Sequence, residues 1–192
     1  YPDRNIHAIG VSLGGNILLK YLGEHGNSPA VQSAAAISVP FDLANGARTL
    51  RHGTAKIYQR HLLGSLQSNF YKKTRMMKMP IPIPDKDEID TIYDFDNLVT
   101  APLHGFRDAD DYYEKSSCRQ FIPSIRTPTL LLHAIDDPFM TPEVIPEKNE
   151  LPHCVRLELS RHGGHVGFIE GSMPLKAGYW MDRRIESWLK GY

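Results

Sequence analysis

The sequence has little cysteine, no excess of either charge and no long apolar run. Its 192 residues include two cysteines, Cys118 and Cys154, which are too few for a disulfide framework and are not spaced as metal ligands. We interpret both as incidental thiols of a protein from a reducing compartment. Lys and Arg together number 22, as do Asp and Glu, so the formal net charge is zero. This balance argues against nucleic-acid binding, which favours a basic surface.

No apolar stretch approaches the roughly 20 residues that a helix needs to span a bilayer. Hydrophobic residues make up 41% of the chain, which is typical of a globular protein, and the length suits one domain. The chain opens with Tyr1-Pro2 instead of Met. We therefore expect it to be a fragment or a processed product, and we expect a cytoplasmic location, with any signal or anchor lying upstream.

Short apolar runs alternate with segments of helical periodicity, and this alternation predicts an α/β fold with a parallel sheet. Buried strands are expected at residues 5–10, 31–39 and 127–135, and an alternating strand at residues 154–160. A helix is expected at residues 16–23. The last helix is expected to pack one apolar face on the sheet, because four apolar residues recur there at helical spacing: Met181, Ile185, Trp188 and Leu189.

The middle of the chain has a different character and divides the predicted domain of residues 1–192 into three parts. Residues 1–40 hold the first strand, its helix and the next strand, and residues 123–192 hold the last two strands and the C-terminal helix. Residues 41–122 are predicted to be a helical insertion or cap, with a proline-spaced linker at 79–90 and a helix at 108–120. One or two amphipathic helices are expected at 55–78, with this apolar set: Ile57, His61, Leu62, Leu66 and Phe70.

The stretch NIHAIGVSLGGN, residues 5–16, contains the pattern G-x-S-x-G around Ser12. The pattern alone is also compatible with an ordinary glycine-rich turn. It follows a predicted apolar strand and precedes a predicted helix, which favours a nucleophile elbow that exposes the serine hydroxyl at the end of a strand. It is not a dinucleotide fingerprint, because Ser12 replaces the second glycine, and no Gly-Lys-Ser/Thr follows to make a P-loop.

The glycines of an elbow have a mechanical role. Side chains two residues before and after the serine would collide with the neighbouring strand and helix, so Gly10 and Gly14 are expected to remove those collisions. The helix that follows would point its N-terminus at the site. We therefore expect the backbone N–H of Leu13 to donate to an oxyanion that develops on a substrate carbonyl.

A serine nucleophile needs a base, and the base needs an orienting acid. In this fold the chain order is Ser, acid, His, with the acid after a late strand. The strand LLLHAI ends in Asp136-Asp137-Pro138, so two carboxylates compete, and both could instead cap the following turn. Hydrolases of this fold commonly carry G-x-x-D there. Ala134 occupies the glycine position, which favours Asp137 over Asp136.

The base is expected in the loop after the last strand, SRHGGHVGFIEG, which contains His162 and His165. His165 lies deeper in the loop and is followed by apolar Val166 and Phe168, which can bury and orient its ring. We therefore expect His165 to be the base and His162 to lie at the rim. His7 and His133 fall in predicted strands and are expected to be core or sheet-end residues.

The remaining histidines show no metal-ligand spacing, and the sequence has no H-E-x-x-H or paired Cys/His pattern. The sequence therefore predicts neither a metal nor another cofactor. The expected partner is a small-molecule acyl ester, while the oligomeric state stays open.

The chain resembles the YheT-like branch of the α/β-hydrolases, which is related to animal α/β-hydrolase-domain esterases and lipases and to yeast ethanol acyltransferase/esterases. The resemblance covers essentially all 192 residues. It rests on DNLVTAPLHGFRDADDYYEKSSCRQFIPSIRTPTLLLHAIDD, residues 96–137, and on HGGHVGFIEG. Its shared positions are Asp96, Gly105, Phe106, Asp111, Tyr112, Tyr113, Ser117, Ile125, Pro128 and Asp137. The tyrosine and glycine positions are interpreted as structural.

The resemblance implies an α/β-hydrolase fold lacking its N-terminal strands, and a carboxylic-ester hydrolase of short or medium acyl chains that uses Ser12, Asp137 and His165. The second oxyanion donor of such enzymes would lie upstream of this chain. Two alternatives share the same residues. An alcohol acyltransferase would use the same triad, and a hydrolase-fold fragment could be catalytically inactive.

Overall fold

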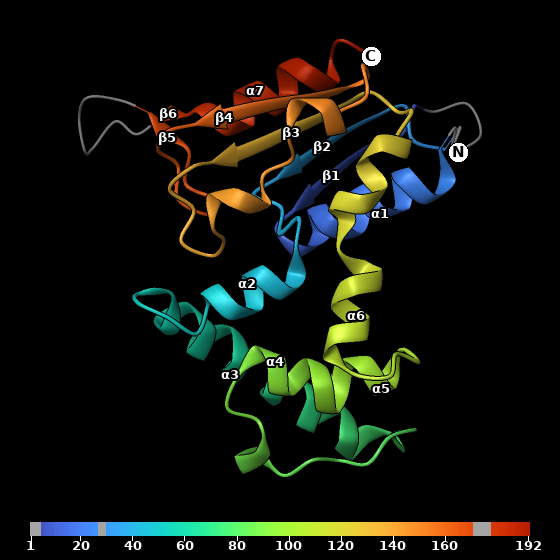
Figure 1. Ribbon diagram of the computed structural model, residues 1–192, viewed down its shortest axis with the longest axis vertical. Coiled ribbons are helices and arrows are strands. Elements are labelled where there is room, and N and C mark those ends of the chain that lie inside the picture. Colours follow the sequence, from blue (N-terminus) through green and yellow to red (C-terminus); the bar gives the residue numbers. More distant parts are fainter. Residues whose placement is uncertain (1–4, 27–29, 171–177) are drawn as a thin grey trace. The chain divides into compact units, whose positions relative to one another are not determined.

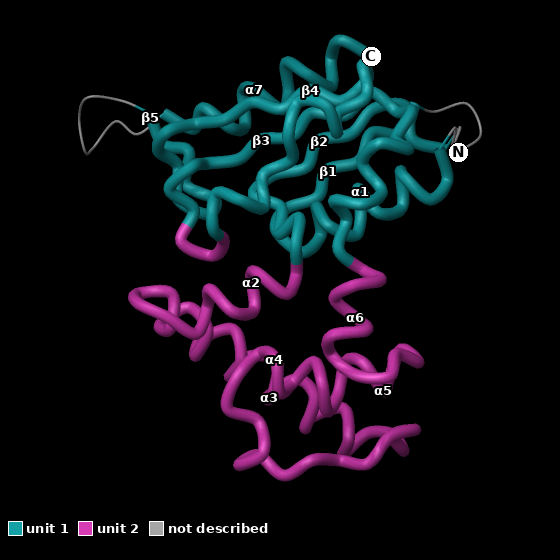
Figure 2. Tube along the Cα trace, viewed as in Figure 1, with its two compact units in different colours: residues 1–42, 117–137, 141–192 teal, residues 43–116, 138–140 magenta. Residues whose placement is uncertain are grey.

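The computed structural model, drawn in Figure 1, describes residues 5–26, 30–170 and 178–192. These residues group into two compact units, which Figure 2 colours separately. The first unit comprises residues 1–42, 117–137 and 141–192, and the second comprises residues 43–116 and 138–140. The assignment of residues 41–122 as an insertion into a hydrolase domain stays a prediction.

The first unit is built on a parallel sheet with the strand order β1-β2-β3-β4. Its strands are β1 (His7–Val11), β2 (Ser33–Ile37), β3 (Thr129–Ala134) and β4 (Val155–Ser160). A separate antiparallel pair joins β5 (Ile169–Glu170) to β6 (Gly178–Tyr179). The predicted parallel α/β architecture is confirmed, and the register aligns the carboxyl ends of the four strands at one edge.

Helices cover this sheet on both sides, as Figure 1 shows for α1 (Leu13–His25) and α7 (Trp180–Leu189). Ile185 of α7 joins one buried cluster with residues of β2 and β3, and Trp188 and Leu189 pack against that cluster. The Trp188 indole also donates from Nε1 to the Ala34 carbonyl oxygen at 3.0 Å. The predicted apolar face of the last helix is therefore confirmed.

The strands differ in burial. Every residue of β2 and β3 is buried, as expected for the middle strands of a parallel sheet. The prediction of a buried strand at residues 5–10 is wrong for its side chains, because Ile6 and Ile9 are exposed, as is Val11. The physical reason is position: β1 is last in the strand order, so among the described residues it pairs with β2 alone.

Short irregular helices complete the first unit. Its 3₁₀ helices span Cys118–Ser124, Pro142–Val144 and Lys148–Glu150. The helix predicted at 108–120 ends earlier, at Ser116, and the 3₁₀ helix that begins at Cys118 replaces its last turn. The chain joins this 3₁₀ helix to α1 through a buried contact, in which the Cys118 N–H donates to Asn16 Oδ1 at 2.8 Å.

The second unit is helical. Its helices are α2 (Leu43–Thr49), α3 (Ala55–Met76), α4 (Ile92–Phe95), α5 (Ala101–Leu103) and α6 (Ala109–Ser116), with a 3₁₀ helix at Lys86–Glu88 and a π-helical turn at Asp96–Thr100. The predicted helical segment at 55–78 is thus one helix. No helix in the described ranges is both long and apolar enough to cross a membrane.

The buried face of α3 differs from the predicted one. Leu63 and Phe70 join the core cluster with Ile89, Phe95 and Val99. Of the predicted apolar set only Phe70 is buried, whereas Ile57 is 70% exposed. The α3 residues that are buried, Ala55, Gln59, Leu63 and Phe70, define a face that follows the helical period from a different start.

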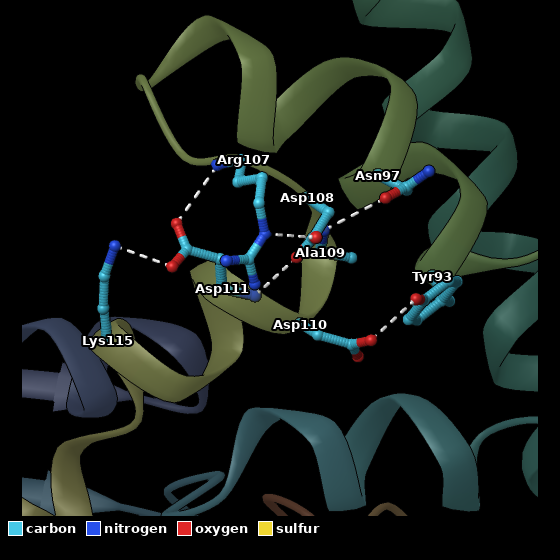
Figure 3. A network of polar contacts seen from close by, with 8 residues as sticks. All are labelled: Tyr93, Asn97, Arg107, Asp108, Ala109, Asp110, Asp111 and Lys115. Atoms are coloured by element: carbon cyan, nitrogen blue, oxygen red, sulfur yellow. Dashed lines mark hydrogen bonds and ion pairs between the residues drawn. The ribbon is translucent and has the colours of Figure 1, made fainter.

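A polar network holds the π-helical turn to α6. The partly buried Asp96 carboxylate accepts from the hydroxyls of Thr100 and Tyr113, each at 2.7 Å. Burial raises the pKa of Asp96, and the two hydroxyl donors act against that rise. Nearby, the Ala109 N–H donates to Asn97 Oδ1 at 3.1 Å, a contact drawn as a dashed line in Figure 3. The Tyr113 contact agrees with a structural role for this tyrosine.

The corrected face of α3 can be tested by a matched pair of substitutions. Leu63→Ala should lower the free energy of unfolding by about 2–4 kcal/mol, because it leaves a cavity in the core. Ile57→Ala, on the same helix, should change it by less than about 0.5 kcal/mol because that side chain is exposed. Urea denaturation measures both free energies of unfolding. A larger loss for Ile57→Ala than for Leu63→Ala would favour the buried face predicted from the sequence.

Candidate active site

Ser12 is the single residue between β1 and α1, and its backbone is strained. Its φ of 51° and ψ of −124° lie in a region that residues other than glycine rarely adopt. Hydrogen bonds over-determine this conformation: the Ser12 N–H donates to the Ile37 carbonyl at 2.8 Å, and the Ser12 carbonyl accepts from the N–H groups of Gly15 and Asn16. The sharp strand-to-helix turn predicted for this stretch is thus present.

Two glycines make the close packing of this turn possible, and one of them is not the predicted one. A Cβ at Gly10 would lie 2.5 Å from the Gly14 carbonyl oxygen, as predicted for an elbow glycine. A Cβ at Gly14, by contrast, would meet no described atom within 4 Å. Gly15 fills the tight position instead, since its Cβ would lie 2.6 Å from Val39 Cγ2. The steric role expected of Gly14 belongs to Gly15.

The structure brings Ser12, His165 and Asp137 together from segments far apart in the sequence. His165 Nε2 lies 2.8 Å from Ser12 Oγ, and His165 Nδ1 lies 2.8 Å from Asp137 Oδ2. An ionised carboxylate can only accept a hydrogen bond, so Nδ1 carries the proton that faces Asp137. In the neutral ring Nε2 is then the acceptor for the Ser12 hydroxyl, which is the arrangement that a general base requires.

The side chains of Asp137 and His165 differ in their exposure to water. The side chain of Asp137 is 1% exposed and that of His165 is 15% exposed, so the carboxylate is screened from water and the ring is partly open. Ser12 occupies the N-cap position of α1, yet its side chain makes no capping hydrogen bond. A serine at this position usually caps the helix, whereas here its hydroxyl is directed at the imidazole.

The neighbouring acid and histidine make different contacts. Asp136 Oδ1 accepts from the backbone N–H groups of Gly163 and Gly164, each at 2.9 Å. His162, with a side chain 90% exposed, places Nδ1 3.4 Å from Asp136 Oδ2. The sequence offers two carboxylates and two histidine rings. The ring that contacts Ser12 is His165, and the carboxylate that contacts this ring is Asp137.

Leu13 is the first residue of α1, so its N–H lies among the helix N-terminal donors that have no intrahelical acceptor. It follows Ser12 directly, and the helix dipole adds partial positive charge at this end. The predicted role of Leu13 requires that an oxyanion, formed on an atom bonded to Ser12 Oγ, accept a hydrogen bond from this donor. The geometry is compatible with the predicted oxyanion role of Leu13.

Two buried polar side chains lie near the candidate site: His133, which was expected as a core or sheet-end residue, and Ser38, which was not singled out in the sequence. Ser38 follows β2 with a φ of 50°, and His133 lies on β3. Ser38 Oγ and His133 Nδ1 are both buried without a hydrogen-bond partner among the described residues. Burial lowers the pKa of His133, with the Asp137 carboxylate acting in the opposite direction. The sequence carries no signal for the positive φ of Ser38, because a left-handed backbone is usually marked by glycine and this position holds serine.

The strand histidines have structural contacts. His133 packs its ring against Phe41 with centroids 5.6 Å apart, and His7 Nδ1 lies 2.8 Å from Ser33 Oγ. Within the described ranges no group of three His, Cys, Asp or Glu side chains is arranged to hold a metal ion.

Comparison with known proteins places the chain in a family. The family model described as the alpha/beta hydrolase fold matches residues 1–172. The chain belongs to the α/β-hydrolase family. YheT of Escherichia coli K12 is 41% identical over 187 residues, covering 96% of this chain and 55% of YheT. The resemblance to the YheT-like branch of the α/β-hydrolases is thereby confirmed.

Other α/β-hydrolase relatives extend the comparison. The monoacylglycerol lipase of Saccharomyces cerevisiae is 34% identical and covers 88% of this chain and 39% of the yeast protein. Phospholipase ABHD3 of Mus musculus is 34% identical and covers 99% of this chain and 46% of the mouse protein. The chain spans about half the length of the curated relatives it matches.

A solved structure shows the same fold. The monoacylglycerol lipase of Paleococcus ferrophilus matches 97% of this chain and 68% of its own chain, with a TM-score of 0.50 and 16% identity. At that identity the likeness concerns the fold alone. The α/β-hydrolase fold expected from the resemblance is thus confirmed.

The reassigned glycine roles give a direct test. Gly10→Ala should lower the free energy of unfolding by about 2–3 kcal/mol, because the new Cβ would push into the backbone of α1. Gly14→Ala should cost less than about 0.5 kcal/mol, since the Cβ meets open space and alanine favours a helix. Thermal and urea unfolding of the two variants compare them, and equal costs would contradict the packing described for this turn.

Proposed function

We propose that the protein is a serine hydrolase that cleaves carboxylic esters of short or medium acyl chains. The observation that carries this proposal is the relay of two 2.8 Å contacts that joins Ser12 Oγ through His165 to the buried Asp137. The names of two relatives, a monoacylglycerol lipase and a phospholipase, support chemistry on acyl esters. The substrate is then a small-molecule acyl ester.

In this proposal Ser12 Oγ attacks the ester carbonyl carbon while its proton moves to His165 Nε2. Asp137 accepts the Nδ1–H throughout, which keeps the ring in the required tautomer and stabilises the imidazolium that forms. The Leu13 N–H donates to the oxyanion of the tetrahedral intermediate. His165 then returns its proton to the leaving alcohol, and Ser12 is left carrying the acyl group as an ester.

The second half of the reaction repeats these roles with water. His165 Nε2 takes a proton from water as the water oxygen attacks the acyl carbonyl. His165 then returns this proton to Ser12 Oγ as the intermediate collapses, which releases the acid and restores the Ser12 hydroxyl. An alcohol in place of water would form a new ester on the same residues. The proposed triad therefore accounts for both hydrolysis and acyl transfer, and the acceptor alone separates the two outcomes.

Substitution of the triad in the whole protein tests the proposed roles. Ser12→Ala and His165→Gln should each lower kcat for a chromogenic acyl ester by about 10³–10⁶-fold, because each removes a member of one catalytic unit. Asp137→Asn should lower it by about 10²–10⁴-fold, since the ring loses its preferred tautomer. The loss should appear in kcat, and fluorophosphonate labelling should disappear in Ser12→Ala.

Matched controls come from the same two segments. His162→Gln changes the other histidine of the loop, and Asp136→Asn changes the adjacent carboxylate while keeping an acceptor oxygen. Both variants should keep kcat within about fivefold of the wild type, as expected for residues outside the reacting unit. Retained labelling in Ser12→Ala, or a larger loss in His162→Gln than in His165→Gln, would overturn the assignment.

The acyl-length part of the proposal needs its own measurement. A series of chromogenic esters of increasing chain length should give a maximum in kcat/KM at short or medium chains, since each buried methylene contributes about 0.8 kcal/mol until the pocket is filled. Adding ethanol and measuring ethyl ester against free acid separates transfer from hydrolysis. A rate that rises without limit along the series would contradict the proposed chain length.

A further inference from the structure

The loop that carries His165 is held at both ends by contacts of its own. At its start Ser160 Oγ donates to the His162 carbonyl at 2.5 Å and accepts from the His162 N–H at 3.3 Å. At its end the buried Phe168 joins the core cluster on β2 and β3, and its N–H donates to the Gly163 carbonyl at 3.2 Å. These contacts leave the middle of the loop, directly before His165, to be held by other residues.

Asp136 holds that middle part. Its Oδ1 accepts from the N–H groups of Gly163 and Gly164, both at 2.9 Å, so two consecutive backbone donors converge on one carboxylate oxygen. Gly164 has a φ of 56°, which lets the backbone present both N–H groups to one side as an anion-binding nest. Hydrogen bonds to an ionised acceptor are about twice as strong as neutral ones.

The hydrogen bonds to the loop backbone also favour the ionised form of the Asp136 carboxyl. The N–H of Gly164 lowers the pKa of the Asp136 carboxyl most, and the N–H of Gly163 and the nearby His162 lower it further against the effect of desolvation. The His162 side chain is almost fully exposed, so a hydrogen bond to it is replaceable by water. The backbone contacts are therefore the ones that fix the loop.

The adjacent residues Asp136 and Asp137 thus both bind the loop, one through its backbone and the other through a side chain. Asp136 binds the backbone immediately before His165, and Asp137 binds the His165 ring. Gly163 keeps the backbone close to β3, because a Cβ there would lie 2.9 Å from the Ala134 Cβ. One turn at the end of β3 fixes both the path of the loop and the direction of the ring.

We propose that Asp136 is a positioning residue of the active site, which clamps the Gly163-Gly164 backbone and thereby sets the place of His165 relative to Ser12. This inference rests on the proposed function, because it assigns Asp136 a role in a reaction of Ser12. Asp136 acts through the loop and touches no reacting atom. A shift of about 1 Å in a catalytic group can cost on the order of 100-fold in rate, so loss of the clamp should be visible in kcat.

The test compares Asp136→Ala with Asp136→Asn in the whole protein. The alanine variant should lower kcat by about 10–100-fold with KM within about threefold, because the ring is displaced while the substrate contacts stay. The asparagine variant should recover kcat to within about fivefold of the wild type, because its amide oxygen still accepts both N–H groups. A residue needed only for stability would not give this split between kcat and KM together with the rescue.

Two controls make the outcome decisive. His162→Gln should again leave kcat within about fivefold of the wild type, since the clamp uses backbone donors. Ser12→Ala tests the proposed function separately: if it stays active, the proposed function fails, whereas an inactive Ser12→Ala beside a fully active Asp136→Ala overturns the clamp alone. An asparagine variant as impaired as the alanine variant would also overturn it.

Hydrogen exchange in the wild type covers the case in which Asp136→Ala does not fold. The Gly163 and Gly164 amides should exchange more slowly in the native protein than in a peptide of the same sequence, because each is held in a hydrogen bond. Exchange at the peptide rate would contradict the clamp. The same measurement on Asp136→Asn should show protection retained at both glycines.

Discussion

Four parallel strands in register bring their carboxyl ends to one edge of the sheet, and each part of the candidate site follows one of those ends. Ser12 comes directly after β1, the Asp136-Asp137 turn comes after β3, and the loop with His165 comes after β4. A slip of one residue in any pairing would move the attached side chain to the other face. The site therefore depends on strand register more than on any single contact within it.

That register is fixed by burial on both faces of the middle strands. Alternate residues of β2 and β3 pack under α7, and the remaining ones are buried as well, so neither strand can shift without exposing apolar surface. The strained backbone of Ser12 is held by a hydrogen bond to the end of β2, which ties the nucleophile to the same framework. The rigid sheet thus keeps an unfavourable conformation where the chemistry needs it.

The sequence predicted those features that depend on local pattern. The continuous apolar run of β3 and the helical spacing of α7 identified the sheet and its cover, and the order Ser, Asp, His along the chain identified the three side chains that the structure brings together. The parallel sheet and the apolar face of α7 are confirmed because each is encoded in the periodicity of residues close together in the chain, whereas the roles of the three site residues stay a prediction.

Features that depend on contacts between residues far apart in the chain could not be predicted from the sequence. Gly14 and Gly15 are adjacent glycines, and only the approach of Val39 shows which one is sterically required. The face of α3 was misplaced because its apolar and polar residues are mixed, so the partners in the core decide which are buried. The contact of Asp136 with the loop backbone is likewise invisible, since backbone donors of a distant loop carry no residue identity.

A crystal structure of the whole protein after reaction with a fluorophosphonate tests the central claim most directly, namely that the strand ends assemble a working Ser12, His165 and Asp137. The account predicts phosphorus bonded to Ser12 Oγ, a phosphoryl oxygen within hydrogen-bond distance of the Leu13 N–H, and the His165 ring still held by Asp137. An adduct on another residue, no adduct at all, or a His165 ring held by Asp136 would contradict it.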